Sequence, residues 1–194
     1  MNRFGAVLLA GLLAVSVTGC ADEKKEEPVE LTVQAEEGFD EDYSRVMKDY
    51  FSAIEKQDFA AYKAAIYPPF FEKLTEYNKQ KDNKTMEQVF EGLHKQFDED
   101  GYDSWTLTRV VAAIYKNKQG VSSEQDALDF LDAYKSGGMV DEQFVEDTKK
   151  AAKDIQDVKF SVYALYTGDE EDVPVINAKE LLVIKTEDGA YVFG

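Results

Sequence analysis

The chain has 194 residues with 39 acidic and 22 basic side chains, which gives a formal net charge of −17 at pH 7. Apolar residues form 44% of the chain and aromatic residues 12%, enough to bury the core of one globular domain. Because so acidic a surface repels nucleic acids, the composition excludes nucleic-acid binding from the expected functions.

The first twenty residues have the layout of an export signal. One positive charge at Arg3 precedes an almost unbroken run of apolar and small residues over 4–17, which is too short to span a bilayer. The segment Val17-Thr18-Gly19-Cys20 resembles the lipobox of bacterial lipoproteins, in which a peptidase cuts just before the cysteine. The resemblance implies a signal peptide over residues 1–19. The alternative is an ordinary signal peptide that happens to end near a cysteine.

Cys20 is the only cysteine of the chain, so neither an intrachain disulfide nor a cysteine metal cluster can form. The resemblance implies that Cys20 is lipidated, and the two or three acyl chains of such a cysteine hold a protein stably on a membrane. We therefore expect an extracytoplasmic protein, anchored by its lipid to the bacterial cell membrane as its first partner.

Residues 20–38 are expected to form an acidic tether. Its first half, Ala21 to Pro28, is charged and holds no core residue. In its second half Val29, Leu31 and Val33 alternate with polar residues, which would suit a short edge strand. Residues 39–194 are then expected to form a single α+β domain.

Helical spacing of apolar residues predicts six helices in this domain. The first covers 41–56, the second 59–66 with Asp58 as N-cap, and the third 70–78 after the break at Pro68-Pro69. Thr85 and Gln88 form a capping box for the fourth helix, which ends at 98–101, and Ser122 and Gln125 form one for the fifth, which ends near Ser136. Asp141 caps the sixth, whose apolar stripe reaches Ile155.

Four strands are predicted, mostly at the end of the chain. Residues 105–116 are rich in Val, Thr and aromatic residues and indicate a long strand, with a helix as the alternative because of Ala112 and Ala113. Alternation predicts further strands over 158–167 and 174–185. A hairpin turn at 187–189 leads to the last strand over 190–193.

Residues 50–59, Tyr-Phe-Ser-Ala-Ile-Glu-Lys-Gln-Asp-Phe, resemble the opening of the NTF2-like (cystatin-like) superfamily. There a long first helix ends at a similar step and a short helix follows. The resemblance implies an α+β fold in which N-terminal helices pack on a curved antiparallel sheet that wraps the first helix and leaves a cone-shaped pocket. The two helices between Ser122 and Ile155 would then be an insertion before the last strands.

Arg109 and Glu180 are the candidate site residues inside the domain. Alternation places Arg109 on one strand face with Trp105 and Leu107, and Glu180 on one with Leu182. A charge on an apolar strand face must be paired or face a cavity, because desolvating it alone is unfavourable. Both would then point into the cone, together with Trp105, Tyr163 and Tyr166. The alternative is a bulge or edge position that turns each charge to water.

Other chemistry is not indicated. His94 is the only histidine and lacks a partner for a metal set, so it is expected at the surface or boundary of the core. The acidic stretches 98–103 and 169–172 do not have the donor spacing of a calcium loop, and no phosphate loop, nucleophile elbow or zinc-protease helix is present. We expect no metal and no cofactor.

The sequence favours a non-catalytic binding or interaction domain, with a small molecule or an envelope protein as its ligand. One alternative is an enzyme of the NTF2-like type, in which Glu180, its pKa raised by burial, transfers a proton beside Tyr163 or Tyr166. Another alternative is a structural envelope component, with exposed apolar surface as its signature.

Overall fold

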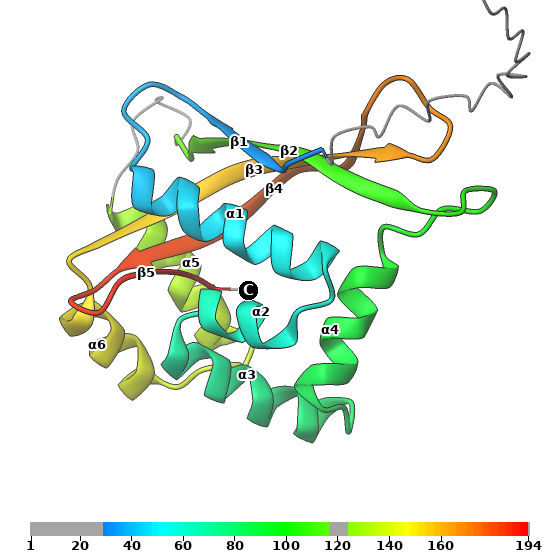
Figure 1. Cartoon of the computed structure of the whole chain (residues 1–194). Helices are drawn as coiled ribbons and strands as arrows, with labels where there is room; N and C mark the ends of the chain where they lie inside the picture. The colour runs from blue at the N-terminus through cyan, green and yellow to red at the C-terminus, as the bar shows by residue number, and fades with distance from the viewer. Residues whose placement is uncertain (1–28, 117–123, 194) are drawn as a thin grey trace, which may run out of the picture.

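The computed structural model describes residues 29–116 and 124–193 of the chain (Figure 1). The signal segment 1–19, Cys20, the first half of the tether and Ser122 lie outside these residues. In chain order the described residues form β1 (Thr32–Ala35), α1 (Glu41–Glu55), α2 (Phe59–Ala65), α3 (Pro68–Lys81), α4 (Met86–Lys95), β2 (Trp105–Ile114), α5 (Glu124–Ser136), α6 (Glu142–Ala151), β3 (Asp154–Tyr166), β4 (Val173–Lys185) and β5 (Ala190–Val192).

The five strands form one sheet in the order β1-β2-β3-β4-β5. All neighbours are antiparallel except β1 and β2, which run parallel, so the sheet is mixed and the prediction of a purely antiparallel sheet is wrong at this edge. The reason lies in the connection: α1 to α4 separate β1 from β2, and so long a crossover allows parallel pairing.

β1 lies within the range expected to be a tether. It is the short edge strand that the alternation of Val29, Leu31 and Val33 suggested, and Leu31 beside it is only 2% exposed. The folded domain therefore begins before residue 39, and the second half of the expected tether contributes to the core.

The sheet curls around α1, which lies across its concave face (Figure 1). α1 begins at Asp40, whose side chain accepts a hydrogen bond from the Asp42 amide, and it buries its apolar stripe against the sheet. The Phe51 ring packs on Phe160 of β3 with ring centroids 5.5 Å apart. On its other side α1 meets α2, and Tyr50 and Tyr62 are in contact. The concave face is filled by these side chains.

α5 and α6 follow β2 and precede β3, where the sequence placed an inserted helical pair. α5 covers the outer face of the sheet where β3 begins and β4 ends, and α6 packs against α5. There Leu182 and Ile184 of β4 and Leu131 of α5 are 0% exposed. Val183 of β4, on the other face of the strand, is also 0% exposed. This end of the sheet is thus covered on both faces, while the rest of its outer face is open to solvent.

The other predicted elements are confirmed with shifted bounds. β2 is a strand and not a helix, and α3 begins at Pro68 because proline is well suited to the first turn of a helix. The predicted sixth helix is too long: α6 ends at Ala151, and Ile155 belongs to β3, where it pairs with Ile184. The fold is α+β, with six helices and a curled mixed sheet of five strands within the described residues.

Candidate functional site

Two of the predicted pocket residues pack in the concave face: Tyr166 is buried in the core and Trp105 is half-buried against it. Tyr166 is 4% exposed, and its hydroxyl donates to the Phe97 carbonyl oxygen at 2.9 Å. The Trp105 ring packs on Phe97 and His94, and its Nε1 donates to Asp98 Oδ1 at 2.9 Å. Both side chains hold the loop after α4 against the sheet, so the expected cone is packed at this point.

Arg109 lies on the outer face of the sheet. A bulge between Leu107 and Arg109 shifts the alternation of β2, so that Leu107 and Val110 point inward and Arg109 points outward. The guanidinium group lies 3.9 Å from the centre of the Tyr163 ring and pairs with Asp172 at 2.8 Å. The predicted neighbours Arg109 and Tyr163 are thus together, on the face opposite to the one expected.

Glu180 is exposed and lies opposite Lys159 on the outer face. Glu180 shares a face with Leu182 as predicted, but this is the outer face and not the concave one. Ala178, which has a positive φ of 51°, interrupts the alternation of β4, so Ile176 lies on the opposite face. Glu180 is separate from Arg109 and from Tyr166, and the proposed proton-transfer set is not assembled. The alternative, a bulge or edge position that turns each charge away from the core, describes Arg109 through its bulge, and Glu180 is exposed without one.

His94 of α4 and Glu55, the last residue of α1, are each hydrogen-bonded to a main-chain group. His94 Nδ1 lies 2.9 Å from the Ile54 carbonyl oxygen, as expected for a boundary histidine. Glu55 Oε1 accepts from the Leu107 amide at 3.0 Å beside the β2 bulge, and burial raises the pKa of the Glu55 carboxyl. The first contact joins α4 to α1, and the second joins α1 to β2. Among the described residues no group of His, Cys, Asp or Glu has the arrangement of a metal site.

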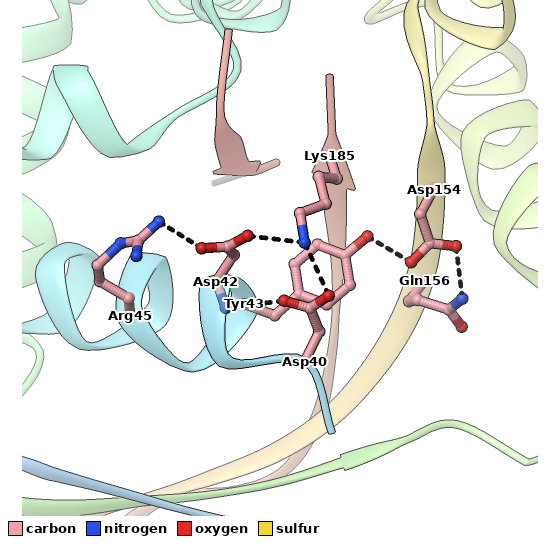
Figure 2. Close-up of polar contacts among 7 residues, drawn as sticks. All are labelled: Asp40, Asp42, Tyr43, Arg45, Asp154, Gln156 and Lys185. Carbon is pink, nitrogen blue, oxygen red and sulfur yellow. Dashed lines mark hydrogen bonds and ion pairs between the residues drawn. The ribbon is translucent and has the colours of Figure 1, made fainter. Parts of the chain in front are cut away.

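A polar network fastens the start of α1 to the ends of β3 and β4 (Figure 2). Lys185 Nζ lies 2.8 Å from Asp40 Oδ2 and 2.7 Å from Asp42 Oδ2. The Tyr43 hydroxyl donates to Asp154 Oδ2 at 2.7 Å. These bonds tie the N-terminal turn of α1 to the strands from both sides.

The network also sets the ionisation of its members. The hydrogen bonds from Lys185 lower the pKa of both Asp40 and Asp42, and in return they raise the pKa of Lys185 to about 12. Burial, with the Asp154 hydrogen bond, raises the pKa of Tyr43. A hollow of about 390 Å³ adjoins the network between α1 and α2, but its Asp42 and Arg45 are already paired with each other at 2.6 Å. The network therefore serves stability.

Asp157 is a buried carboxylate on the outer face of β3, beneath α5. Its side chain is 6% exposed, and no hydrogen-bond partner reaches its Oδ1 among the described residues. Burial, followed by the nearby charges of Glu180 and of Asp126 on α5, raises the pKa of Asp157 to about 6. At neutral pH α5 therefore covers a buried negative charge.

A hollow with a volume of about 660 Å³ and mostly apolar walls lies between α2 and α3. We call it the α2–α3 hollow. Its walls are formed by Ala60, Lys63, Ala64, Pro68, Phe71, Glu72, Thr75 and Glu76. The hollow exists because α2 presents alanines, and not larger side chains, toward α3.

A second hollow of about 330 Å³ adjoins the first and shares Lys63, Phe71 and Thr75 with it. We call it the lysine hollow, because Lys63, Lys79 and Lys84 line it; its other walls are Phe59, Asn83, Thr85, Met86 and Glu87. Together the two hollows form a groove along α3 with an apolar floor, and we call them the helical groove.

No protein-family profile matches the chain, and no curated protein or solved structure was found to be similar to it. The site assignment therefore depends on the geometry of this chain. None of the described helices is both long and apolar enough to cross a membrane.

Reasoning from the sequence did not find the helical groove. Its one local signal is the pair Ala60 and Ala64, which are four residues apart and so lie on one face of α2. The larger apolar side chains of this helix, Phe59, Tyr62 and Ile66, point to a different buried side. That α3 lies close enough to turn this small-residue face into a hollow depends on the turn at Tyr67-Pro68, whose direction the sequence does not reveal.

Proposed function

We propose that this chain is a bacterial lipoprotein whose NTF2-like domain is a non-catalytic binding module on the extracytoplasmic side of the cell membrane. The observation that carries the binding role is the helical groove, with its apolar floor and its hollow of about 660 Å³. Ligand sites of small molecules are typically concave, mostly apolar and of about 300–1,000 Å³. The groove has these properties, whereas the concave face of the sheet is filled.

The NTF2-like assignment is supported by the position of α1. The helix that carries the resembling segment lies in the concave face of a curled sheet, and the short helix α2 follows it (Figure 1). The inserted pair α5 and α6 and the parallel strand β1 depart from the expected pattern.

The proposed anchor agrees with the position of the groove. Thr32 opens β1 at one edge of the sheet, and α3 lies on the opposite side of the molecule (Figure 1). The chain from Cys20 to Thr32 can span at most about 40 Å, since an extended residue covers about 3.3–3.6 Å. A lipid on Cys20 would thus keep the start of the folded domain within about 40 Å of the membrane, on the side of the molecule opposite to the helical groove.

The anchor is tested by replacing Cys20→Ser in cells grown with a radioactive fatty acid. Because the lipid is added to the thiol before cleavage, the variant should take up no label and should accumulate as an uncleaved or mislocalised precursor. Thr18→Ser, which keeps the lipobox pattern, is the matched control and should be labelled and sediment with membranes. A Cys20→Ser protein that still carried label in the membrane fraction would disprove the anchoring.

A further inference from the structure

The lysine hollow has an unusual charge for this protein. Lys63 on α2, Lys79 on α3 and Lys84 before α4 converge on it from three separate segments, with Glu87 as the one acidic side chain among its walls. The chain as a whole carries a formal net charge of −17. A local excess of positive charge in so acidic a chain calls for a physical explanation.

These lysines are also available to a ligand. No carboxylate of a described residue lies within ion-pair distance of Lys63, Lys79 or Lys84, although Lys73, Lys135 and Lys185 are all paired. The contact found for Lys63 is with the Phe71 ring, whose centre lies 5.1 Å from Nζ. An anion in the lysine hollow would meet three ammonium groups without displacing an existing carboxylate.

The adjoining α2–α3 hollow has mostly apolar walls and leads into the lysine hollow. Ala60, Ala64, Pro68 and Phe71 line it, and it runs along α3 from Pro68 toward Lys79. At the helical rise of 1.5 Å per residue this distance is about 16 Å, which suits one extended hydrocarbon chain. Glu72 and Glu76 line this hollow together with Lys63, whereas Lys79 and Lys84 line only the lysine hollow, so the two carboxylates would disfavour an anionic group in the α2–α3 hollow.

We propose that the helical groove binds a free single-chain carboxylate amphiphile, of the fatty-acid class, with its tail in the α2–α3 hollow and its head among Lys63, Lys79 and Lys84. This inference rests on the proposed binding role of the groove and adds the ligand's chemistry. Apolar burial of the tail provides affinity, and the ion pairs fix its direction. The net charge of the protein does not prevent this, because at physiological ionic strength charges beyond about 8 Å are screened.

The experiment uses the full-length protein in isolated membranes and three photoreactive twelve-carbon probes with the same tail: a carboxylate, an alcohol and a trimethylammonium. After illumination, mass spectrometry locates the labelled peptides. The carboxylate should label the segment 59–87, and its yield there should exceed that of the ammonium probe about tenfold, because two or three exposed ion pairs together contribute on that order.

Variants identify the groups responsible. The double change Lys79→Glu with Lys84→Glu should reduce carboxylate labelling about tenfold and raise that of the ammonium probe, for the same electrostatic reason. Lys95→Glu, at an exposed lysine of α4 outside the groove, should leave labelling unchanged. Ala64→Arg, at an exposed position of α2, should reduce labelling by every probe because its side chain fills the α2–α3 hollow.

The outcomes separate the two proposals. Equal labelling of 59–87 by all three probes would overturn the inference and leave the groove as an apolar binding site. Preferential labelling of 59–87 by the alcohol or the ammonium probe would also overturn it. Labelling by no probe within 59–87, or labelling unaffected by Ala64→Arg, would overturn both the inference and the binding role proposed for the groove, while the anchor would still be judged by Cys20→Ser.

Discussion

The sheet is covered by α1 on its concave face and by α5 on part of its outer face, and the two covers differ in whether their buried or half-buried charges are paired. On the concave face α1 buries an apolar stripe, and the charges at its start, Asp40 and Asp42, are matched by Lys185 (Figure 2). On the outer face α5 covers Asp157, a carboxylate that has two further acidic groups nearby and no cation among the groups that shift its pKa. The charges of the α1 cover are thus paired with an opposite charge, whereas the α5 cover buries a carboxylate beside other acidic groups.

This difference implies opposite responses to acid. The lowered pKa values of Asp40 and Asp42 mean that the α1 network stabilises the fold above their ordinary pKa of 3.8, and that this contribution is lost as the pH falls through the lowered values. The raised pKa of Asp157 has the opposite sign: its charged form destabilises the fold above about pH 6, and protonation removes the penalty as the pH falls. Mild acid should therefore strengthen the α5 cover before it weakens the α1 cover.

The largest effect is expected in the α1 cover. Phe51 is 2% exposed and packs on Phe160, so Phe51→Ala leaves a cavity in a filled face and should lower the free energy of unfolding by about 3–5 kcal/mol. Val111→Ala on the open outer face, where Val111 is 39% exposed, should change it by no more than about 0.5 kcal/mol. Urea denaturation measures both. Similar losses for the two variants would show that the two faces are not packed as differently as described.

The next effect concerns Asp157 and should have the opposite sign. A shift of the pKa from 3.8 to about 6 corresponds to a penalty of at most about 3 kcal/mol when the carboxylate is charged, at 1.36 kcal/mol per unit. Asp157→Asn removes the charge, so it should stabilise the protein by about 1–3 kcal/mol at pH 8, by progressively less between pH 6 and 4, and not at all below pH 3.8.

Two comparisons make the Asp157 result specific. Urea denaturation at pH 8, 6 and 4.5 should show that Asp157→Asn abolishes part of the pH dependence, and hydrogen exchange should locate the gain in α5. Asp129→Asn, at an exposed position of α5 bonded to Gln125, is the matched control and should leave the pH dependence as in the parent protein. A destabilised Asp157→Asn variant at pH 8 would mean that the carboxylate has a favourable partner and that the contrast between the covers is incorrect.

Local signals explain which parts of the fold were predictable. The capping residues act within one turn, and three of them are confirmed: Asp58 accepts from the Ala61 amide, Thr85 and Gln88 form both bonds of a capping box, and Asp141 accepts from the Phe144 amide. Helix starts can therefore be read from the sequence, because the groups that decide them are neighbours in the chain.

Long-range signals explain what was missed. The parallel pairing of β1 depends on a strand more than seventy residues away, and the burial of Asp157 depends on where α5 docks. The bulge before Arg109 also depends on a distant residue: Glu55 of α1 accepts a hydrogen bond from the Leu107 amide, and the alternation of β2 restarts after Leu107. A pattern of alternating residues fixes a face only while the strand stays regular, so Arg109 was placed with residues on the other side of a bulge. Glu180 was placed correctly with Leu182, but the pattern does not say which face of the sheet α1 covers.

The smallest effects are expected on the open part of the outer face, at Arg109 and Glu180. Arg109 is partly exposed, pairs with Asp172 and stacks on Tyr163, so Arg109→Met should cost about 1 kcal/mol in the free energy of unfolding. Glu180 is exposed, and Glu180→Leu should change this free energy by no more than about 0.5 kcal/mol. Because the two residues share no partner, the double variant should equal the sum of the single changes within about 0.5 kcal/mol. Urea denaturation of the three variants measures this. A double variant about 2 kcal/mol more stable than that sum would mean that the two charges interact inside the fold, as a buried pair does when one partner is removed, and that the outer face is not the open surface that distinguishes it from the α1 cover.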